Sequence, residues 1–228
     1  DFNDFDDLKQ KIDSEVCAVI IEPVQGESGI HPADIQYLRK VRKLCTKENI
    51  TLIFDEVQSG IGRTGFLFAH EYFNVFPDVI CLAKGLGGGL PIGAILSTDK
   101  FSQYEPGDHA ATFGGNPLVC TGALAVLNEL LNNNLLENVK KTGSYLDNRL
   151  KLLADKYSLI SDVRGLGLMM GVEFSIPVAE LITECRENGL LLVSAGQNTI
   201  RFVPPLLITE LEIDKAINIL DFVIYNFA

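Results

Sequence analysis

Residues Thr51 to Leu96 read TLIFDEVQSGIGRTGFLFAHEYFNVFPDVICLAKGLGGGLPIGAIL, and this stretch decides the fold of the chain. It contains two short apolar runs, TLIF and VICLA, which are bounded by Gly and Pro and rich in branched residues. Runs of this kind predict buried strands of a parallel sheet. Asp55 follows the first run and Lys84 follows the second. Because ligand sites in open α/β sheets lie beyond the carboxyl ends of such strands, we expect a carboxylate and an amine at one crevice.

An amine and a carboxylate at the ends of these two strands suit the binding of a cofactor that has a carbonyl group and a pyridine ring. Lys84 opens a loop with four glycines in the next five residues. Desolvation at the end of an apolar strand lowers the pKa of a lysine, and an uncharged amine forms a Schiff base with a carbonyl. A carboxylate such as that of Asp55 keeps a pyridine ring protonated, which makes pyridoxal phosphate (PLP) an electron sink. From these two residues alone, a solvated lysine and a helix-capping or ion-paired aspartate stay open as alternatives.

Four motifs occur in order along the chain: IIEPVQGESG, FDEVQSGIGRTG, AKGLGGGLPIGA and TFGGNPL. In this order they resemble the class III PLP-dependent aminotransferases, and the resemblance runs from about Val16 to the C-terminus. It implies an α/β architecture, the fold type I of PLP-dependent transferases, with a mostly parallel sheet in a large cofactor domain and a small C-terminal α/β domain. Relative to the family, the N-terminal segment and the first part of the cofactor domain are missing, so we expect a C-terminal fragment.

The resemblance implies a role for each of several residues around the cofactor. Lys84 corresponds to the lysine that forms the Schiff base with pyridoxal 5'-phosphate, and Asp55 to the partner of the pyridinium nitrogen. In the family, the residue at Val57 packs on the ring and the one at Gln58 hydrogen-bonds the ring oxygen. Thr112 matches a threonine that reaches the cofactor phosphate of the other subunit, which implies a homodimer. The alternatives are ordinary strand packing for the first pair and a turn or helix-cap role for Thr112.

Arg201 lies in the apolar segment TIRFVPPLLIT, between Ile200 and Phe202. An arginine in such a strand needs a carboxylate partner, because its guanidinium stays charged. That partner is either the α-carboxylate of a substrate or an acidic residue of the chain. The resemblance favours the substrate. It also identifies Glu27 as the family's glutamate that pairs with this arginine and moves away when a dicarboxylic substrate binds.

The activity that the resemblance implies is transamination. The amino group of N-acetylornithine would pass to 2-oxoglutarate, giving N-acetylglutamate semialdehyde and glutamate, as in arginine biosynthesis, with Lys84 as acid and base. GIGRTG and TFGGNPL favour N-acetylornithine over ornithine, succinylornithine and 4-aminobutyrate, which stay open as alternatives. An inactive truncated chain is another alternative, because much of the family's phosphate-binding and ring-stacking apparatus is absent.

GIGRTG, Gly60 to Gly65, also matches the G-x-G-x-x-G spacing of a dinucleotide-binding loop. Residues 55–59 separate the strand from these glycines, and the following FLFAHEYFNVF is not a clean helix. No acidic residue ends a second strand about 20 residues further on, as that motif requires. An NAD-linked oxidoreductase is therefore a disfavoured alternative.

Composition and charge exclude other classes of protein. The chain has 228 residues and a formal net charge of -11, which argues against nucleic-acid binding because phosphates attract clustered Lys and Arg. Neither a membrane span nor a signal peptide is indicated. Five cysteines, odd in number and mostly in apolar runs, favour reduced, buried thiols in a cytoplasmic protein over disulfides or a metal site. The amino acid and oxo acid substrates are the expected small-molecule partners.

The predicted elements of the first domain, residues 1–134, form a mixed sheet. A strand over Val16 to Val24, a helix in HPADIQYLRKVRKLCTKEN with Asp34 in its first turn, and the strand TLIF make a βαβ unit. Only eight residues separate VICLA from IGAILS, too few for a parallel crossover, so these two strands should be antiparallel. After Ser97 a loop leads to a helix over Pro117 to Leu131, which is apolar on most faces and therefore expected to be buried.

The predicted second domain covers residues 135–228. It begins with an amphipathic helix, Leu135 to Tyr157, that carries Leu146, Leu150 and Leu153 on one face. Strands in SLISDVRGLGLMMGVEF, LLLVS and TIRFV then alternate with helices in PVAELITECRENG and at the C-terminus. This alternation predicts a small α/β domain. Thr209 followed by Glu212 predicts the capping box of the closing helix.

Overall fold

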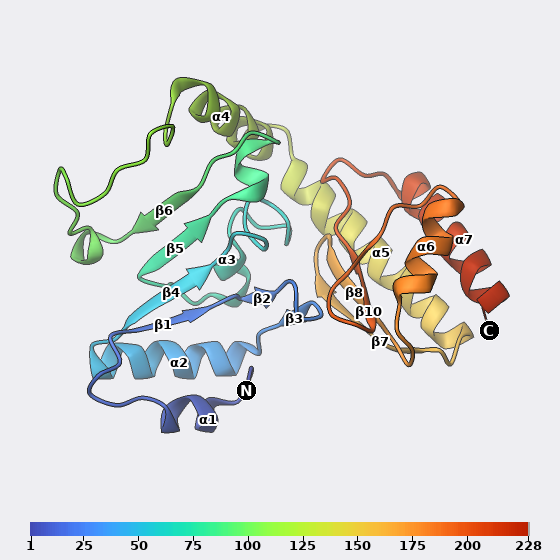
Figure 1. Cartoon of the computed structure of the whole chain (residues 1–228), viewed down its shortest axis with the longest axis horizontal. Coiled ribbons are helices and arrows are strands. Elements are labelled where there is room, and N and C mark those ends of the chain that lie inside the picture. The colour runs from blue at the N-terminus through green and yellow to red at the C-terminus, as the bar shows by residue number, and fades with distance from the viewer. Residues whose placement is uncertain (228) are drawn as a thin grey trace. The chain divides into compact units, whose positions relative to one another are not determined.

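The computed structural model describes residues 1–227, and the chain forms two compact units (Figure 1). The first unit consists of Asp1–Pro23, Ala33–Ile61 and Phe66–Asn133. The second consists of Val24–Pro32, Gly62–Gly65 and residues 134–227. Two short segments from the first half of the chain thus belong to the second unit. Among the helices described, none is long and apolar enough to cross a membrane.

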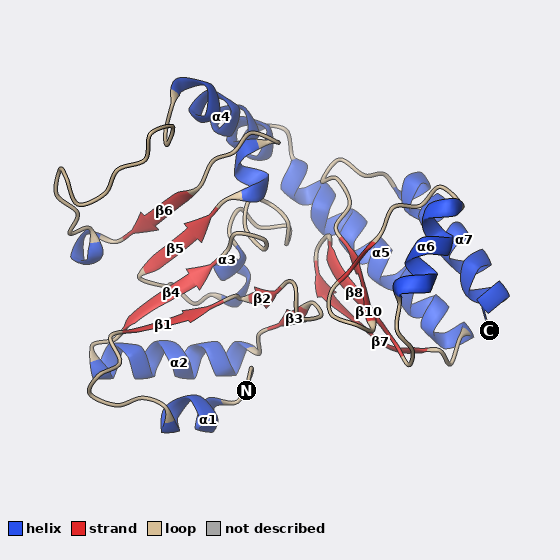
Figure 2. Ribbon diagram, viewed as in Figure 1, coloured by secondary structure: helices blue, strands red, loops and turns tan. Residues whose placement is uncertain are grey.

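A four-stranded sheet in the order β1-β4-β5-β6 forms the centre of the first unit (Figure 2). Its strands are β1 (Ala18–Ile21), β4 (Thr51–Asp55), β5 (Val79–Leu82) and β6 (Ala94–Ser97). β1, β4 and β5 are parallel, whereas β6 is antiparallel to β5. The mostly parallel, mixed sheet predicted from the sequence is confirmed, including the antiparallel edge that the short connection between β5 and β6 requires.

Helix α2 (Ile35–Glu48) connects β1 to β4 and packs against β4 through its apolar side. The buried residues of that side are Tyr37, Leu38, Val41 and Cys45. Asp34 is the N-cap rather than a residue of the first turn, because its carboxylate accepts the backbone N–H of Tyr37 at 2.8 Å. Asn49, in the left-handed conformation, ends the helix. The βαβ unit predicted from the sequence is therefore present.

The remaining elements of the first unit are short except for one helix. They are α1 (Phe5–Gln10), α3 (Ala69–Phe73), the 3₁₀ turns η1 (Lys84–Gly87) and η2 (Asp99–Phe101), and α4 (Pro117–Asn132). The prediction that α4 is buried was wrong, because three of its leucines are at least 60% exposed: Leu118, Leu124 and Leu131. The side of α4 that carries the buried residues Val119 and Ala123 packs mainly on η1. Its apolar composition therefore does not lead to burial on all sides.

The second unit contains an antiparallel sheet in the order β7-β8-β10-β9. The strands are β7 (Ile160–Leu166), β8 (Met169–Phe174), β9 (Val193–Ser194) and β10 (Thr199–Phe202). Three helices share a core with this sheet: α5 (Leu135–Lys156), α6 (Ala179–Glu187) and α7 (Glu210–Phe227). Leu146, Leu150 and Leu153 of α5 are buried in that core, as their helical spacing predicted.

A small hairpin, β2 (Val24–Gln25) and β3 (His31–Pro32), packs on the sheet of the second unit through β7. Ile30 of this hairpin is fully buried. A Cβ at Gly171 of β8 would lie only 2.9 Å from the Ile30 side chain. Neighbouring residues of a strand face opposite sides of the sheet. Gly171 faces the hairpin and Val172 faces the core that contains the helices, so the hairpin and the helices lie on opposite faces of the sheet.

Local signals at the ends of α6 and α7 match the structure. The carboxylate of Glu212 accepts the backbone N–H of Thr209 at 2.8 Å, and the Thr209 hydroxyl accepts the N–H of Glu212, which confirms the capping box. Gly189, with φ of 89°, follows the C-terminus of α6 at the predicted stop.

All five cysteines are free thiols, as predicted. Cys45 and Cys185 are buried, and burial raises the pKa of both thiols, that of Cys185 to about 11. The expectation of burial is wrong for Cys17, which is exposed. Its carbonyl accepts the N–H of Thr51, so the backbone already lies alongside β4 while the side chain faces outward.

Candidate functional site

Asp55 is the last residue of β4, at the carboxyl end of the parallel part of the first sheet. It lies opposite Cys81 of β5, and the Cys81 carbonyl accepts the N–H of Glu56 at 3.0 Å, which keeps the two strand ends together. The Asp55 side chain is half-buried, and its Oδ1 accepts the backbone N–H of Val57 at 3.0 Å. The second oxygen, Oδ2, accepts no hydrogen bond from residues 1–227. It can therefore accept a hydrogen bond from a ligand.

Glu56, the next residue, fixes the turn after β4, and the sequence analysis missed it. Its side chain is fully buried and accepts the backbone N–H groups of Ala69 and His70 at 2.5 and 2.9 Å. Nδ1 of His70 is 3.0 Å from the same carboxylate. This carboxylate therefore ties the start of α3 to the turn that follows Asp55. The only signal in the sequence was a second acidic residue directly after the strand.

Lys84 begins η1, two residues after the end of β5. Since β5 is the parallel neighbour of β4, both strands end at the same edge of the sheet. Lys84 adopts a positive φ of 43°, and its amine makes no ion pair within the described chain. The residue is exposed, so the desolvation expected at the end of an apolar strand is not provided by residues 1–227.

The other residues predicted to lie at the cofactor also belong to the first unit. Val57 and Gln58 lie half-buried in the turn after β4. Thr112 lies in the segment between η2 and α4, where it is exposed. Asp55, Val57, Gln58 and Lys84 thus gather where two neighbouring parallel strands end, and Thr112 comes from a separate loop.

Arg201 and Glu27 belong to the second unit and contact each other. Nη1 of Arg201 donates to Oε1 of Glu27 at 2.6 Å. The Arg201 side chain is only 12% exposed, whereas that of Glu27 is 74% exposed. The ion pair expected from the sequence is therefore present, and its two members differ strongly in their access to solvent.

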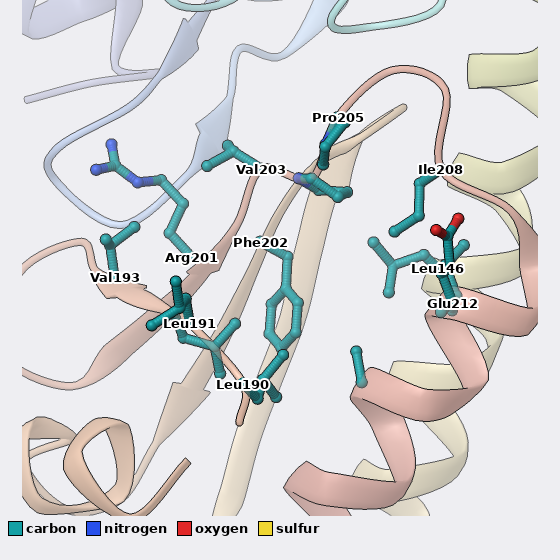
Figure 3. Close-up of a pocket in the computed structure, with 14 residues that line it drawn as sticks. Leu146, Leu190, Leu191, Val193, Arg201, Phe202, Val203, Pro205, Ile208 and Glu212 are labelled. Atoms are coloured by element: carbon teal, nitrogen blue, oxygen red, sulfur yellow. The ribbon is translucent and has the colours of Figure 1, made fainter. Parts of the chain in front are cut away.

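A cavity of about 400 Å³ lies beside Arg201 in the second unit (Figure 3). Its wall is mostly apolar and includes Leu146, Leu190, Phe202 and Ile208. Figure 3 shows the guanidinium of Arg201 directed away from this apolar cluster. The lining of the cavity also includes Glu212, an anion that does not suit a carboxylate, and the guanidinium of Arg201 contacts Glu27 instead.

The loop GIGRTG does not have the structure of a dinucleotide-binding motif. Residues 60–64 form consecutive turns that lead into a bend at Gly65, and Gly62 and Gly65 adopt φ of 82° and 85°. The next helix, α3, begins only at Ala69 and has five residues. A dinucleotide loop needs a long helix that starts at the glycines and directs its N-terminus at the pyrophosphate. The alternative of an NAD-linked oxidoreductase therefore has no support in the fold.

The residues at the ends of β4 and β5 fit pyridoxal phosphate. The ring nitrogen requires a carboxylate, which Asp55 offers through its second oxygen, and the carbonyl requires an amine, which Lys84 offers. Both chemical groups thus come from neighbouring strands of one unit.

Comparison with known proteins identifies the family. The class III aminotransferase family matches residues 2–224 of the chain. The acetylornithine aminotransferase of Clostridium acetobutylicum is 52% identical over 222 residues, which cover 96% of this chain and 57% of that protein. The acetylornithine aminotransferase of Methanocaldococcus jannaschii is 47% identical, with 96% and 56% covered. The chain therefore spans little more than half the length of these relatives.

Solved structures give the same result for the fold. The N-acetylornithine aminotransferase of Stenotrophomonas maltophilia superposes with a TM-score of 0.91 and 38% identity, covering all of this chain and 61% of that one. The ornithine aminotransferase of Plasmodium yoelii gives a TM-score of 0.95 and 38% identity, with 100% and 62% covered. These neighbours have fold type I, and the enzymes of this family use PLP. The chain belongs to the class III aminotransferase family.

Proposed function

We propose that the complete protein is a PLP-dependent aminotransferase that transfers the amino group of N-acetylornithine to 2-oxoglutarate. The observation that carries this proposal is the pair Asp55 and Lys84 at the ends of two neighbouring parallel strands. That pair lies inside a family match over residues 2–224, in a chain 52% identical to an acetylornithine aminotransferase. The products would be N-acetylglutamate semialdehyde and glutamate, a step of arginine biosynthesis.

The first unit holds the cofactor in this proposal. Bound PLP supplies an electron sink for the substrate carbon that carries the amino group. Asp55 binds the protonated ring nitrogen through its carboxylate, and the bond from the Val57 N–H to Oδ1 fixes the orientation of that carboxylate. Val57 packs on the ring and Gln58 hydrogen-bonds the ring oxygen.

Lys84 is the acid and base of the reaction. Its Nζ would hold the cofactor through the carbonyl carbon of that group. As a free amine, Nζ would take up and return the proton at the substrate carbon. The positive φ of Lys84 sets the direction in which its side chain leaves the strand end.

Arg201 binds a substrate carboxylate in this proposal. Between substrates, Arg201 pairs with Glu27. The low exposure of the Arg201 side chain favours a strong, partly desolvated bond to a carboxylate. The high exposure of Glu27 lets this residue turn into solvent with little rearrangement. The same arginine can therefore serve an amino donor and a dicarboxylic oxo acid in successive half-reactions.

The proposal also includes an oligomeric state and a location in the cell. Thr112 is exposed on its loop, which suits a contact to the cofactor phosphate of a second subunit, so we propose a homodimer. The five free cysteines are typical of a reducing compartment, and we propose a cytoplasmic location.

Rates with four amino donors test the substrate. The complete protein is mixed with PLP and 2-oxoglutarate, and glutamate formation is measured with N-acetylornithine, ornithine, succinylornithine and 4-aminobutyrate. We expect the largest kcat/KM with N-acetylornithine. Ornithine is the second candidate, because an ornithine aminotransferase superposes with a TM-score of 0.95. A larger kcat/KM with any of the other donors would overturn the proposed substrate.

The same assay on the 228-residue chain alone tests the alternative of an inactive fragment. The chain spans 57% of the relative from Clostridium acetobutylicum. Activity in the complete protein together with none in the isolated chain would show that the remaining part of the enzyme is needed for turnover.

A further inference from the structure

The segment Gly62–Gly65, here called the glycine strap, packs tightly against the second unit, to which it belongs. A Cβ at Gly167 would lie 2.6 Å from the backbone carbon of Thr64, and one at Gly65 would lie 2.7 Å from the side chain of Lys140. Contacts this close are possible only because these positions lack side chains. Gly167 thus allows the backbone of the strap to come close, and Gly65 allows the Lys140 side chain to lie against the strap.

Arg63 is the residue that the strap inserts into this contact. Nη1 of Arg63 donates to the carbonyl oxygens of Leu168 at 3.2 Å and Pro204 at 2.5 Å. The carbonyl of Arg63 in turn accepts the N–H of Leu168 at 3.0 Å. One residue therefore binds two segments that lie more than 100 positions further along the chain.

The charge of Arg63 has no acidic partner within residues 1–227. Burial lowers the pKa of its guanidinium to about 10, so the group is still protonated at neutral pH. A buried cation that donates to backbone carbonyls and has no anionic partner costs free energy, which the two hydrogen bonds offset only in part. Arginine suits this task because its planar fork reaches several acceptors with fixed geometry, which a lysine amine does not.

The two carbonyls bound by Arg63 lie at one end of the strand pair β8 and β10, and β10 carries Arg201. Leu168 immediately precedes β8, and Pro204 follows the end of β10 by two residues. β8 and β10 are antiparallel, with Phe202 opposite Met170, so Arg63 joins the start of one strand to the exit of the other. Val203 and Pro205, labelled in Figure 3, belong to the segment that follows the end of β10.

We infer that Arg63 is a positioning residue for Arg201: by holding the exit of β10 against the start of β8, it sets where the Arg201 guanidinium meets a substrate carboxylate. This inference rests on the proposed function, in which Arg201 binds that carboxylate. Arg63 acts through the backbone and does not itself touch the substrate. The signature motif GIGRTG then has a role in substrate alignment rather than in phosphate binding.

The first test uses kinetics of the complete protein with three variants, Arg63→Gln, Arg63→Lys and the control Arg186→Gln, an exposed arginine near the end of α6. We expect Arg63→Gln to raise KM for 2-oxoglutarate about tenfold with a much smaller change in kcat, because displacing a binding group weakens substrate alignment. Arg63→Lys keeps the charge and should restore part of the loss. The control should leave KM unchanged.

A double-mutant cycle separates positioning from a general structural effect. In an Arg201→Gln background, Arg63→Gln should change KM less than about twofold, since the group that it positions is gone. An equal rise of KM in both backgrounds would overturn the inference. The inference would also be overturned if Arg63→Gln left KM unchanged in the protein that keeps Arg201.

Amide hydrogen exchange gives a readout that does not depend on activity. We expect Arg63→Gln to speed exchange in residues 199–206 while exchange in β4 and α2 stays the same. If Arg201→Gln raises KM but Arg63→Gln changes neither KM nor this exchange, only the positioning role is wrong. If Arg201→Gln leaves KM unchanged, the proposed substrate role of Arg201 is wrong and the inference is overturned with it.

Discussion

Arg201 and Glu27 form an ion pair of 2.6 Å in which the arginine is nearly buried and the glutamate is 74% exposed. The attraction in such a pair is weaker than in a fully buried ion pair, because water solvates one partner and screens the charges. The glutamate can therefore leave at little cost. The arginine cannot, since its strand is held in the middle of an antiparallel sheet.

Glu27→Gln is expected to lower KM for 2-oxoglutarate about two- to fivefold. The neutral side chain no longer competes with the substrate carboxylate for Arg201, and an ion pair whose carboxylate is solvated contributes up to about 1 kcal/mol. Initial rates over a range of 2-oxoglutarate concentrations measure the change. Glu187→Gln, on the exposed end of α6, is the matched control. A rise in KM would contradict the proposed competition.

Asp55→Asn is expected to reduce kcat by about 10³-fold while PLP still binds. The amide has nearly the shape of the carboxylate, but it cannot stabilise a positive charge on the ring nitrogen, and losses of this size are typical when such a charge is removed. Stopped-flow single turnovers measure the chemical step. Asp99→Asn, an exposed residue of η2, is the control. A variant at Asp55 with the rate of the original protein would rule out the proposed role of this carboxylate.

Glu56→Ala is expected to lower the free energy of unfolding by about 3 kcal/mol. The substitution removes the acceptor of two buried backbone N–H groups and of the His70 ring, and each buried donor left unsatisfied is costly. Urea unfolding followed by circular dichroism gives the value. Glu15→Ala, which removes an exposed carboxylate, serves for comparison. Equal stability of the two variants would show that the buried carboxylate does not anchor α3.

Asp221→Asn is expected to destabilise the second unit at pH 7 but not near pH 2. Hydrogen bonds from Lys156 and Tyr157 hold the pKa of Asp221 below its ordinary value of 3.8. A depressed folded-state pKa contributes stability above the unfolded-state value, and that contribution is lost as pH falls through the folded-state value. The loss at pH 7 should be no more than about 1 kcal/mol, because the pair is partly exposed. Urea titrations at both pH values measure it.

A matched variant completes that experiment. Asp155→Asn, one residue before Lys156, removes an exposed carboxylate with no ion pair in the described chain. Its stability should follow that of the original protein at both pH values. A stability difference for Asp221→Asn that persists undiminished at pH 2 would mean that packing, not charge, explains the effect.

Much of the first unit followed from local patterns in the sequence. The helical spacing of Leu38, Val41 and Cys45 predicted α2, and the short connection between β5 and β6 predicted their antiparallel pairing. Asp55 and Lys84 lie at adjacent strand ends because parallel strands bring their carboxyl ends to one edge. These features depend on neighbours within about 30 residues, which is the range over which periodicity and loop length are informative.

Other features had no local signal. The glycine strap and the segment Val24–Pro32 belong to the second unit, yet their sequences are continuous with strands of the first. The contacts of Arg63 with Leu168 and Pro204 join positions more than 100 residues apart. The exposure of α4 also could not be predicted, because an apolar composition does not say which surfaces meet the helix.

Covalent trapping of the cofactor tests the central claim most directly. PLP is added to the complete protein, the visible absorption band is recorded, and the sample is reduced with borohydride, digested and mapped by mass spectrometry. We predict a band in the original protein and in Lys43→Ala, an exposed lysine of α2, and none in Lys84→Ala. The pyridoxyl group should be found on the peptide that contains Lys84. A reduced cofactor attached to a different lysine, or a protein that forms no band, would contradict the assignment of Lys84 and with it the proposed function.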